Sequence, residues 1–220
     1  MAYIRKSLDQ LVNRTEPAWP LVQDWISKAV RLVEVLPPSE RAGDALVSVQ
    51  VTTRSPMGAV IFNTGGLLVD HGWLRILGSG HPRLSRSLPD WNFSCGMQES
   101  DTPPPWVLVA DDVVGGFFAL DGGRFGGDKP AVWYFAPDVL EWENTDCGYS
   151  EFLCWSFSGK LDLFYESWRW PSWQTEVANI RGDQALSFYP PLCADGPALA
   201  ERSRAAVSIT EVFRLNVGTV

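Results

Sequence analysis

Histidine, cysteine and long apolar runs are all scarce in this sequence of 220 residues. The four cysteines, at positions 95, 147, 154 and 193, include no CxxC pair, so neither a zinc ribbon nor a dense disulfide framework is expected. Buried free thiols in a reducing compartment fit this spacing better. No run of about eighteen uncharged apolar residues occurs, and the opening MAYIRKSLDQLVNR lacks a signal-peptide core. We therefore expect a cytoplasmic protein without a membrane-spanning helix.

Positive charge is also in deficit. The chain has 18 lysines and arginines against 26 aspartates and glutamates, which gives a net charge of −8 and a pI of about 4.8. That average charge repels nucleic-acid backbones and anionic membranes, so neither is expected as a partner. A basic protein would be attracted instead. Solubility alone is an equally good explanation of the acidity.

Catalytic and cofactor motifs are missing as well. The glycine pairs match neither GxGxxG nor a P-loop and are typical of turns. Ser79 lies in GSGH, which differs from the GxSxG nucleophile elbow. His71 and His81 are ten residues apart, which is not a common metal-ligand spacing. We predict no catalytic residue, no metal and no cofactor.

The sequence does contain a succession of short apolar segments joined by glycine and proline, which favours an α+β fold. We predict a single domain over residues 1–220, with a helical part at 1–50 and a sheet-based core with a C-terminal extension at 58–220. A central mixed or antiparallel sheet is expected, covered on one face by the N-terminal helices and a helix near 150–158. Its strands are predicted near residues 58–77, 106–120 and 131–143.

Hydrophobic spacing predicts the individual elements. Apolar residues at three- and four-residue steps predict a helix from Leu21 to Val33, closed by Pro37 and Pro38. Two apolar runs, Ala59–Phe62 and Leu67–Val69, flank NTGG and predict a hairpin. Further helices are expected at 5–13, 39–50, 83–91, 150–157 and 172–180, a strand at 161–165, a loop at 99–105, and a strand or a helix at 207–217.

Acidic residues at strand ends are the first candidates for binding. Asp111 and Asp112 follow an apolar strand, and Asp121 ends the next one. Neighbouring residues of a strand point to opposite faces, so the first two are not expected to work as a catalytic pair. We expect all three carboxylates to be solvated and to face outward, where they would attract a basic partner.

Aromatic residues are the second candidates. The chain has 11 tryptophans, and the segment SWRWPSW places three of them together: Trp168, Trp170 and Trp173. Tryptophan is enriched at binding hot spots, but large rings also fill protein cores. A combined acidic and aromatic docking surface is one hypothesis. A homodimer that uses this segment as its interface is another.

The segment DHGWLRILGSGH at residues 70–81 offers an alternative site. If its polar side chains converge, they would form a pocket for a small ligand or for an unassigned reaction. Those side chains are His71, Arg75, Ser79 and His81. If Asp70 and His71 instead hold a tight turn and the others are dispersed, protein binding is favoured over catalysis.

Two resemblances extend these expectations. The strings ADDVVGGFFALDGG, VWYFAPD and YSEFL resemble the core of the SUKH superfamily over about fifty residues. That likeness implies a non-enzymatic α+β protein, often the immunity partner of a secreted bacterial toxin. Over nearly the whole chain the sequence more closely resembles a bacterial protein family of unknown function, family 2625. The segments that carry this likeness are EPAWPLV, QVTTRSPMGAV, GGLLVDHGWLRILGSGH and SWRWPSW.

Overall fold

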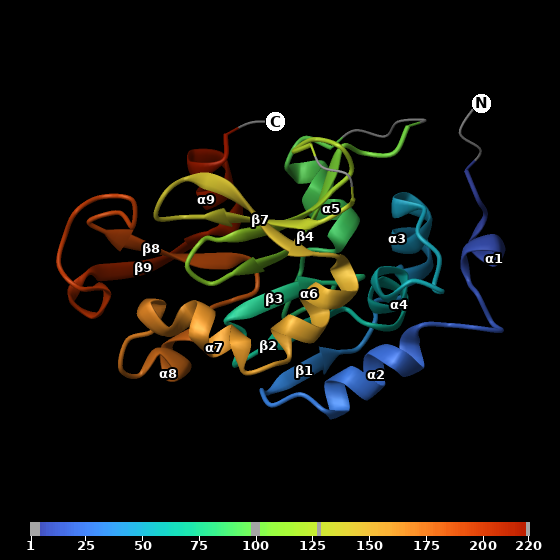
Figure 1. The fold of residues 1–220 in the computed structure, drawn as a ribbon, viewed down its shortest axis with the longest axis horizontal. Coiled ribbons are helices and arrows are strands. Elements are labelled where there is room, and N and C mark those ends of the chain that lie inside the picture. Colours follow the sequence, from blue (N-terminus) through green and yellow to red (C-terminus); the bar gives the residue numbers. More distant parts are fainter. Residues whose placement is uncertain (1–4, 98–101, 127–128, 219–220) are drawn as a thin grey trace.

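The computed structural model describes residues 5–97, 102–126 and 129–218, and its architecture is α+β (Figure 1). A seven-stranded antiparallel sheet follows the order of the chain from β1 to β7, and β8 and β9 form a separate antiparallel pair. The strands are β1 (Val33–Leu36), β2 (Gly66–Val69), β3 (Leu74–Leu77), β4 (Trp106–Asp112), β5 (Phe117–Asp121), β6 (Val132–Ala136), β7 (Glu141–Cys147), β8 (Gln184–Tyr189) and β9 (Ser203–Ser208). The predicted antiparallel sheet is confirmed.

Helices separate several of these strands. They are α1 (Leu8–Leu11), α2 (Trp19–Ser27), α3 (Ala42–Val49), α4 (Pro56–Asn63), α5 (Leu88–Ser94), α6 (Tyr149–Ser156), α7 (Lys160–Tyr165), α8 (Trp173–Val177) and α9 (Ile209–Asn216), with short 3₁₀ helices at Glu166–Trp168 and Leu199–Glu201. Within the described ranges, none of these helices is long and apolar enough to cross a membrane.

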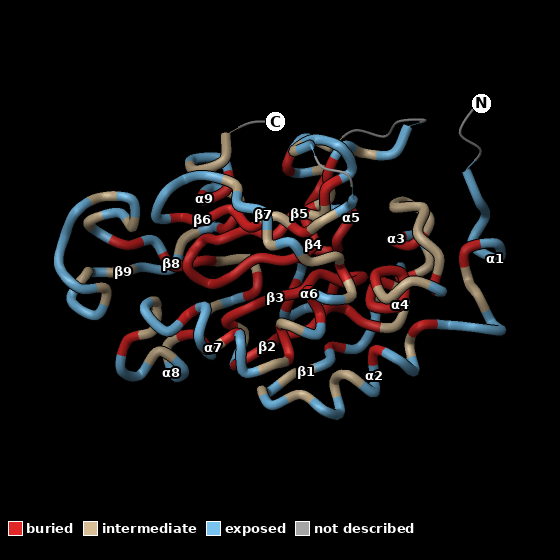
Figure 2. The backbone as a smooth tube through the Cα atoms, viewed as in Figure 1, coloured by how far each residue is buried: buried red, intermediate tan, exposed pale blue. Residues whose placement is uncertain are grey.

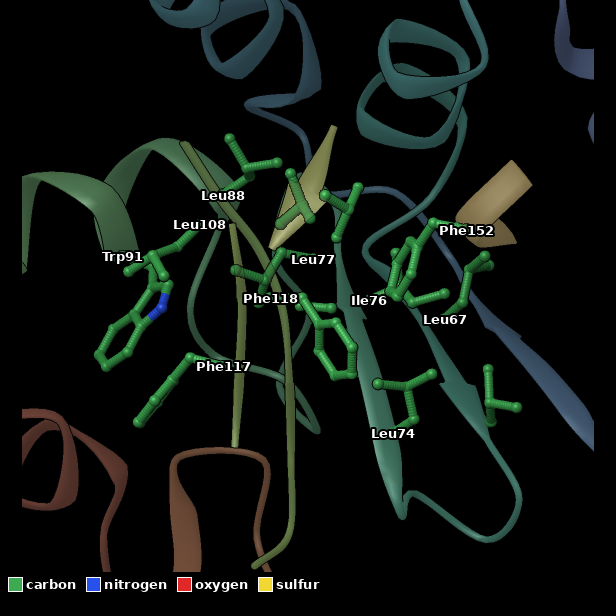
Figure 3. Close-up of a cluster of buried hydrophobic side chains, with 14 of the residues drawn as sticks. Leu67, Leu74, Ile76, Leu77, Leu88, Trp91, Leu108, Phe117, Phe118 and Phe152 are labelled. Atoms are coloured by element: carbon green, nitrogen blue, oxygen red, sulfur yellow. The ribbon is translucent and has the colours of Figure 1, made fainter. Parts of the chain in front are cut away.

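The core lies on both faces of the sheet. Phe117 and Phe118 are neighbours on β5, so their side chains point to opposite faces (Figure 3). Phe117 contacts Trp91 of α5 and Phe213 of α9, and Phe118 packs on Phe152 of α6. Helices therefore cover both faces, whereas the sequence placed the covering helices on one. Figure 2 shows the buried centre of the sheet.

The run Ala59–Phe62 belongs to α4, so the predicted hairpin is wrong in its first half. The hydroxyl of Ser55 accepts a hydrogen bond from the backbone N–H of Gly58, and Pro56 occupies the first turn, which together start a helix. Five consecutive residues of α4 are buried, from Met57 to Ile61. A helix that is apolar on all sides has no 3.6-residue pattern to reveal it.

Two other elements differ from the prediction. The helix that starts near Leu21 ends at Ser27, and Val33–Leu36 form the edge strand β1 paired with β2, so the two prolines end a strand. Residues 161–165 lie in α7 and not in a strand, because Leu161 and Tyr165 are both fully buried at helical spacing. The segment 207–217 is a strand as far as Ser208 and a helix afterwards.

Candidate functional site

Asp111 lies inside the protein and not on its surface. It pairs with Arg75 across β3 and β4, and the two guanidinium groups of Arg75 and Arg86 each lie 2.7 Å from one of its oxygens. Arg86 also donates to the carbonyl of Gly182, and Arg75 donates to that of Gln184. The expected solvent exposure of Asp111 is wrong, because β4 continues through it and partners from distant segments cover it.

Asp112 is equally buried and points the other way, as predicted from the strand period. One of its oxygens accepts from the backbone N–H groups of Val114 and Gly116, and the other accepts from the hydroxyls of Tyr134 and Tyr165, at 2.7–3.0 Å. Burial raises the pKa of this carboxyl, and the hydrogen bonds from Gly116 and the two tyrosines oppose that rise. Asp112 therefore joins the β4–β5 turn to β6 and α7.

Asp121 is buried as well, which corrects the third expected exposed carboxylate. Its Oδ1 accepts hydrogen bonds from the backbone N–H groups of Gly123 at 2.9 Å and Phe125 at 3.1 Å. This side chain closes the turn that follows β5, a common use of aspartate.

The three tryptophans of SWRWPSW do not form an exposed row. Trp170 is buried and donates from its Nε1 to Glu176 at 2.9 Å. Trp173 is half-buried and packs edge-to-face on Trp73, and Trp168 ends a 3₁₀ helix half-buried against the core. Most of their ring surface thus serves packing within the chain. The homodimer through this segment stays a prediction.

The alternative site at residues 70–81 divides between two cavities. His71 and Arg75 line a cavity of about 300 Å³, whereas Ser79 and His81 line another of about 590 Å³. The hydroxyl of Ser79 donates to the carbonyl of Thr64 and accepts from the N–H of Ser39, so it is held by the backbone. The four side chains do not converge on one reacting atom.

Asp70 and His71 form the β2–β3 turn, as expected in the second of the two alternatives for this segment. Both have positive φ, at 52° and 63°, and Asp70 accepts a backbone hydrogen bond from Trp73. The carboxylate of Asp70 pairs with Arg169. Among the described residues no group of three or more histidine, cysteine, aspartate or glutamate side chains is placed to hold a metal ion.

Residues 8–212 of the chain match the family described as "Protein of unknown function DUF2625". This chain belongs to that family. It is 44% identical over 211 residues to the uncharacterised protein YbfG of Escherichia coli K12, covering 96% of this chain and 95% of YbfG. It is 40% identical over 213 residues to an uncharacterised protein of Haemophilus influenzae Rd, covering 96% and 93%. The resemblance to this family is confirmed; the SUKH-like core stays a prediction.

Strand β7 of this DUF2625 protein is a surface that the sequence reasoning missed. It is the last strand of the sheet, and no other described strand pairs with its outer edge. Glu141, Glu143 and Asp146 are exposed on it, and none of them forms an ion pair within the described residues. The available signal was the string EWENTD, which alternates acidic residues without a single cation.

Apolar side chains also belong to this strand and to the turn before it. Trp142 lies between Glu141 and Glu143, so its ring points to the opposite face of β7. The ring is half-buried there and packs edge-to-face on Trp106, with 5.3 Å between the ring centres. Val139 and Leu140, in the β6–β7 turn, are 52% and 41% exposed. The name "β7 edge" denotes β7 together with residues 138–140. The β7 edge therefore offers exposed carboxylates on one face of the strand and two exposed apolar side chains in the turn before it.

Proposed function

We propose that this DUF2625 protein is a non-catalytic binding module that holds a basic protein against its β7 edge. The observation that carries the proposal is an edge strand without a strand partner on its outer side, whose exposed carboxylates lack ion-pair partners among the described residues. An immunity role, in which the partner is a secreted bacterial toxin, is the form that the SUKH resemblance suggests.

Negative charge is concentrated in the sequence around this edge. Residues 130–159 include no lysine or arginine and five acidic residues: Asp138, Glu141, Glu143, Asp146 and Glu151. Like charges gathered on one surface add their potentials and attract a basic partner over about a Debye length, roughly 8 Å at physiological salt. This attraction raises the rate of association and restricts the choice of partner more than it raises affinity.

The backbone supplies a second means of recognition. The outer edge of an unpaired strand presents N–H and C=O groups that can accept a strand from another protein. Two copies of β7 would bring Glu141 and Glu143 of one chain close to the same residues of the other, which disfavours pairing between copies. The edge therefore favours a partner of opposite charge over a second copy of this chain.

Catalysis receives no comparable support. Ser79 and His81 line one cavity without a hydrogen bond between them, and the hydroxyl of Ser79 is held by two backbone groups. A nucleophile needs a base within hydrogen-bonding reach, and the structure pairs these two groups with other atoms. The nitrogen Nδ1 of His81 accepts from the backbone N–H of Arg83 at 3.1 Å.

The proposal is tested with two variants of equal charge. The edge variant is Glu141→Gln/Glu143→Gln/Asp146→Asn. Position 146 has a positive φ of 55°, a backbone conformation that asparagine adopts as readily as aspartate. The control variant, Glu40→Gln/Asp195→Asn/Glu201→Gln, removes three exposed carboxylates elsewhere.

Each tagged protein is expressed in its native bacterium and purified. The proteins that co-purify with it are then quantified by mass spectrometry. We expect a basic protein that the wild type and the control variant enrich and that the edge variant loses. If the edge variant enriches the same proteins as the wild type in equal amounts, or if no protein depends on the edge, the proposal is wrong.

A further inference from the structure

The cavity of about 300 Å³ beside the β2–β3 turn is cationic, although the whole chain carries a net charge of −8. Three arginines and one histidine line it against a single carboxylate: Arg75, Arg83, Arg181, His71 and Asp183. These residues come from the β2–β3 turn, from β3, from the loop before α5 and from the loop between α8 and β8. Residues 71–83 and residues 181–183, which are about a hundred positions apart, thus bring three arginines to one cavity.

Arg75, the most buried of these charged groups, belongs to a cluster that contains more cations than carboxylates. Arg75 and Arg86 share the one carboxylate of Asp111, and the side chain of Arg75 is only 3% exposed. The Nε of Arg75 has no hydrogen-bond partner among the described residues. A buried cation without a full set of acceptors is costly, and an anion nearby relieves that cost.

The pKa values agree with this deficit. Burial lowers the pKa of Arg75, and the attraction of Asp111 opposes that change. The carboxyl of the neighbouring Asp112 has a raised pKa because it is buried, and its oxygens accept from Val114, Gly116, Tyr134 and Tyr165 and not from either arginine side chain. The electrostatic imbalance is therefore on the wall of the cavity itself.

The outer arginines are free to change partners. Arg181 pairs with Asp183 at 2.6 Å, and Arg83 pairs with Glu34, but all four side chains are at least one-third exposed. Ion pairs at exposed sites contribute little to stability, so an incoming anion can replace either carboxylate. Ser85 is exposed on the same wall and adds a hydroxyl group.

We propose that this cavity binds the phosphate group of a small molecule. Arginine forks match phosphate oxygens with two parallel hydrogen bonds, and several of them around one cavity are typical of phosphate recognition. The volume suits a compact ligand, at the lower end of the range for small-molecule sites. The site does not involve β7, so it stands independently of the protein-binding proposal.

Isothermal titration of the purified protein with inorganic phosphate and with pyrophosphate tests this assignment. The site variant is Arg83→Gln/Arg181→Gln, which leaves the buried Arg75 in place. The control variant is Arg14→Gln/Arg54→Gln, which removes two arginines that are also exposed and also paired with single carboxylates. Sodium chloride at equal ionic strength is the blank, and citrate is the carboxylate comparison.

We expect saturable one-to-one binding of phosphate or pyrophosphate by the wild type and by the control variant. The dissociation constant should rise roughly tenfold for each arginine removed, because each charge-assisted hydrogen bond is worth about one decade or more. Thermal unfolding of the site variant without ligand verifies that it is folded, and Arg181→Gln alone serves as a second variant. The proposal is overturned if neither anion binds saturably, if the site variant binds as tightly as the wild type, or if citrate binds equally well.

Discussion

Asp111 and Asp112 are adjacent in sequence but have different environments. The carboxylate of Asp111 is paired with two arginines, whereas the carboxylate of Asp112 accepts from neutral donors, two backbone N–H groups and two tyrosine hydroxyls. Gly116 permits the second arrangement, because a Cβ there would lie 2.3 Å from the Oδ2 of Asp112. Both carboxylates hold the fold together, and neither is on the surface.

The raised pKa of Asp112 gives a test by pH. Because the folded state holds this proton more tightly than the unfolded state, the contribution of Asp112 to stability is full below the unfolded pKa of about 3.9 and falls as pH rises through the folded pKa. We expect the free energy of unfolding of the wild type minus that of Asp112→Asn to decrease as pH rises from about 4. Urea unfolding followed by circular dichroism at a series of pH values measures it. A difference that stays constant or increases with pH contradicts the account.

The sequence predicted the opposite orientation of Asp111 and Asp112 but not their burial. A strand period of two places neighbouring residues on opposite faces, which holds for Asp111 and Asp112. Their burial could not be predicted, because partners such as Arg86, Tyr134 and Tyr165 lie 22 to 53 residues away along the chain. Local patterns carry no information about such partners.

The position of helix α4 depends on its packing against the rest of the chain more than on an amphipathic sequence pattern. Gly58 lies where α4 approaches the segment before it, and a Cβ at this position would be 2.1 Å from the carbonyl oxygen of Thr52. Gly159, just before α7, has open space around the same position and a φ of −65°. The two glycines form a matched pair.

Gly58→Ala should therefore destabilise the protein by about 3 kcal/mol, because the added methyl group pushes α4 away from Thr52. Gly159→Ala should range from no change to a gain of about 1 kcal/mol, since alanine fits that backbone conformation. Chemical denaturation of both variants checks the pair. Equal stability of the two variants would mean that the close approach of α4 is wrong.

The amphipathic helix α6 was predicted well, and the apolar helix α4 and the edge strand β1 were not. The buried residues of α6 recur at helical spacing, and the helix lies close to its predicted bounds of 150–157. The strand β1 was assigned to a helix, since Val33 continues the helical spacing of α2 by chance. Its pairing with β2 depends on residues 30 to 36 positions away.

At the scale of the whole molecule, charge is unevenly distributed. The β7 edge carries exposed carboxylates without ion-pair partners among the described residues, and arginines gather at the cavity beside the β2–β3 turn. A chain in which acidity served solubility alone would not need to separate the two signs in this way. The average charge of −8 predicted a basic partner, but only the topology of the sheet indicates where it would bind.

The most direct test of the central claim is a photo-crosslink from the β7 edge in the cells that natively produce the protein. A photoreactive amino acid replaces Asn144, which is exposed on β7, or Asp195, which is exposed in the β8–β9 loop and serves as the control. After irradiation, the account predicts a covalent adduct with one basic protein from position 144 and not from position 195. No adduct at position 144, or the same adducts from both positions, would contradict the claim that the β7 edge binds a protein.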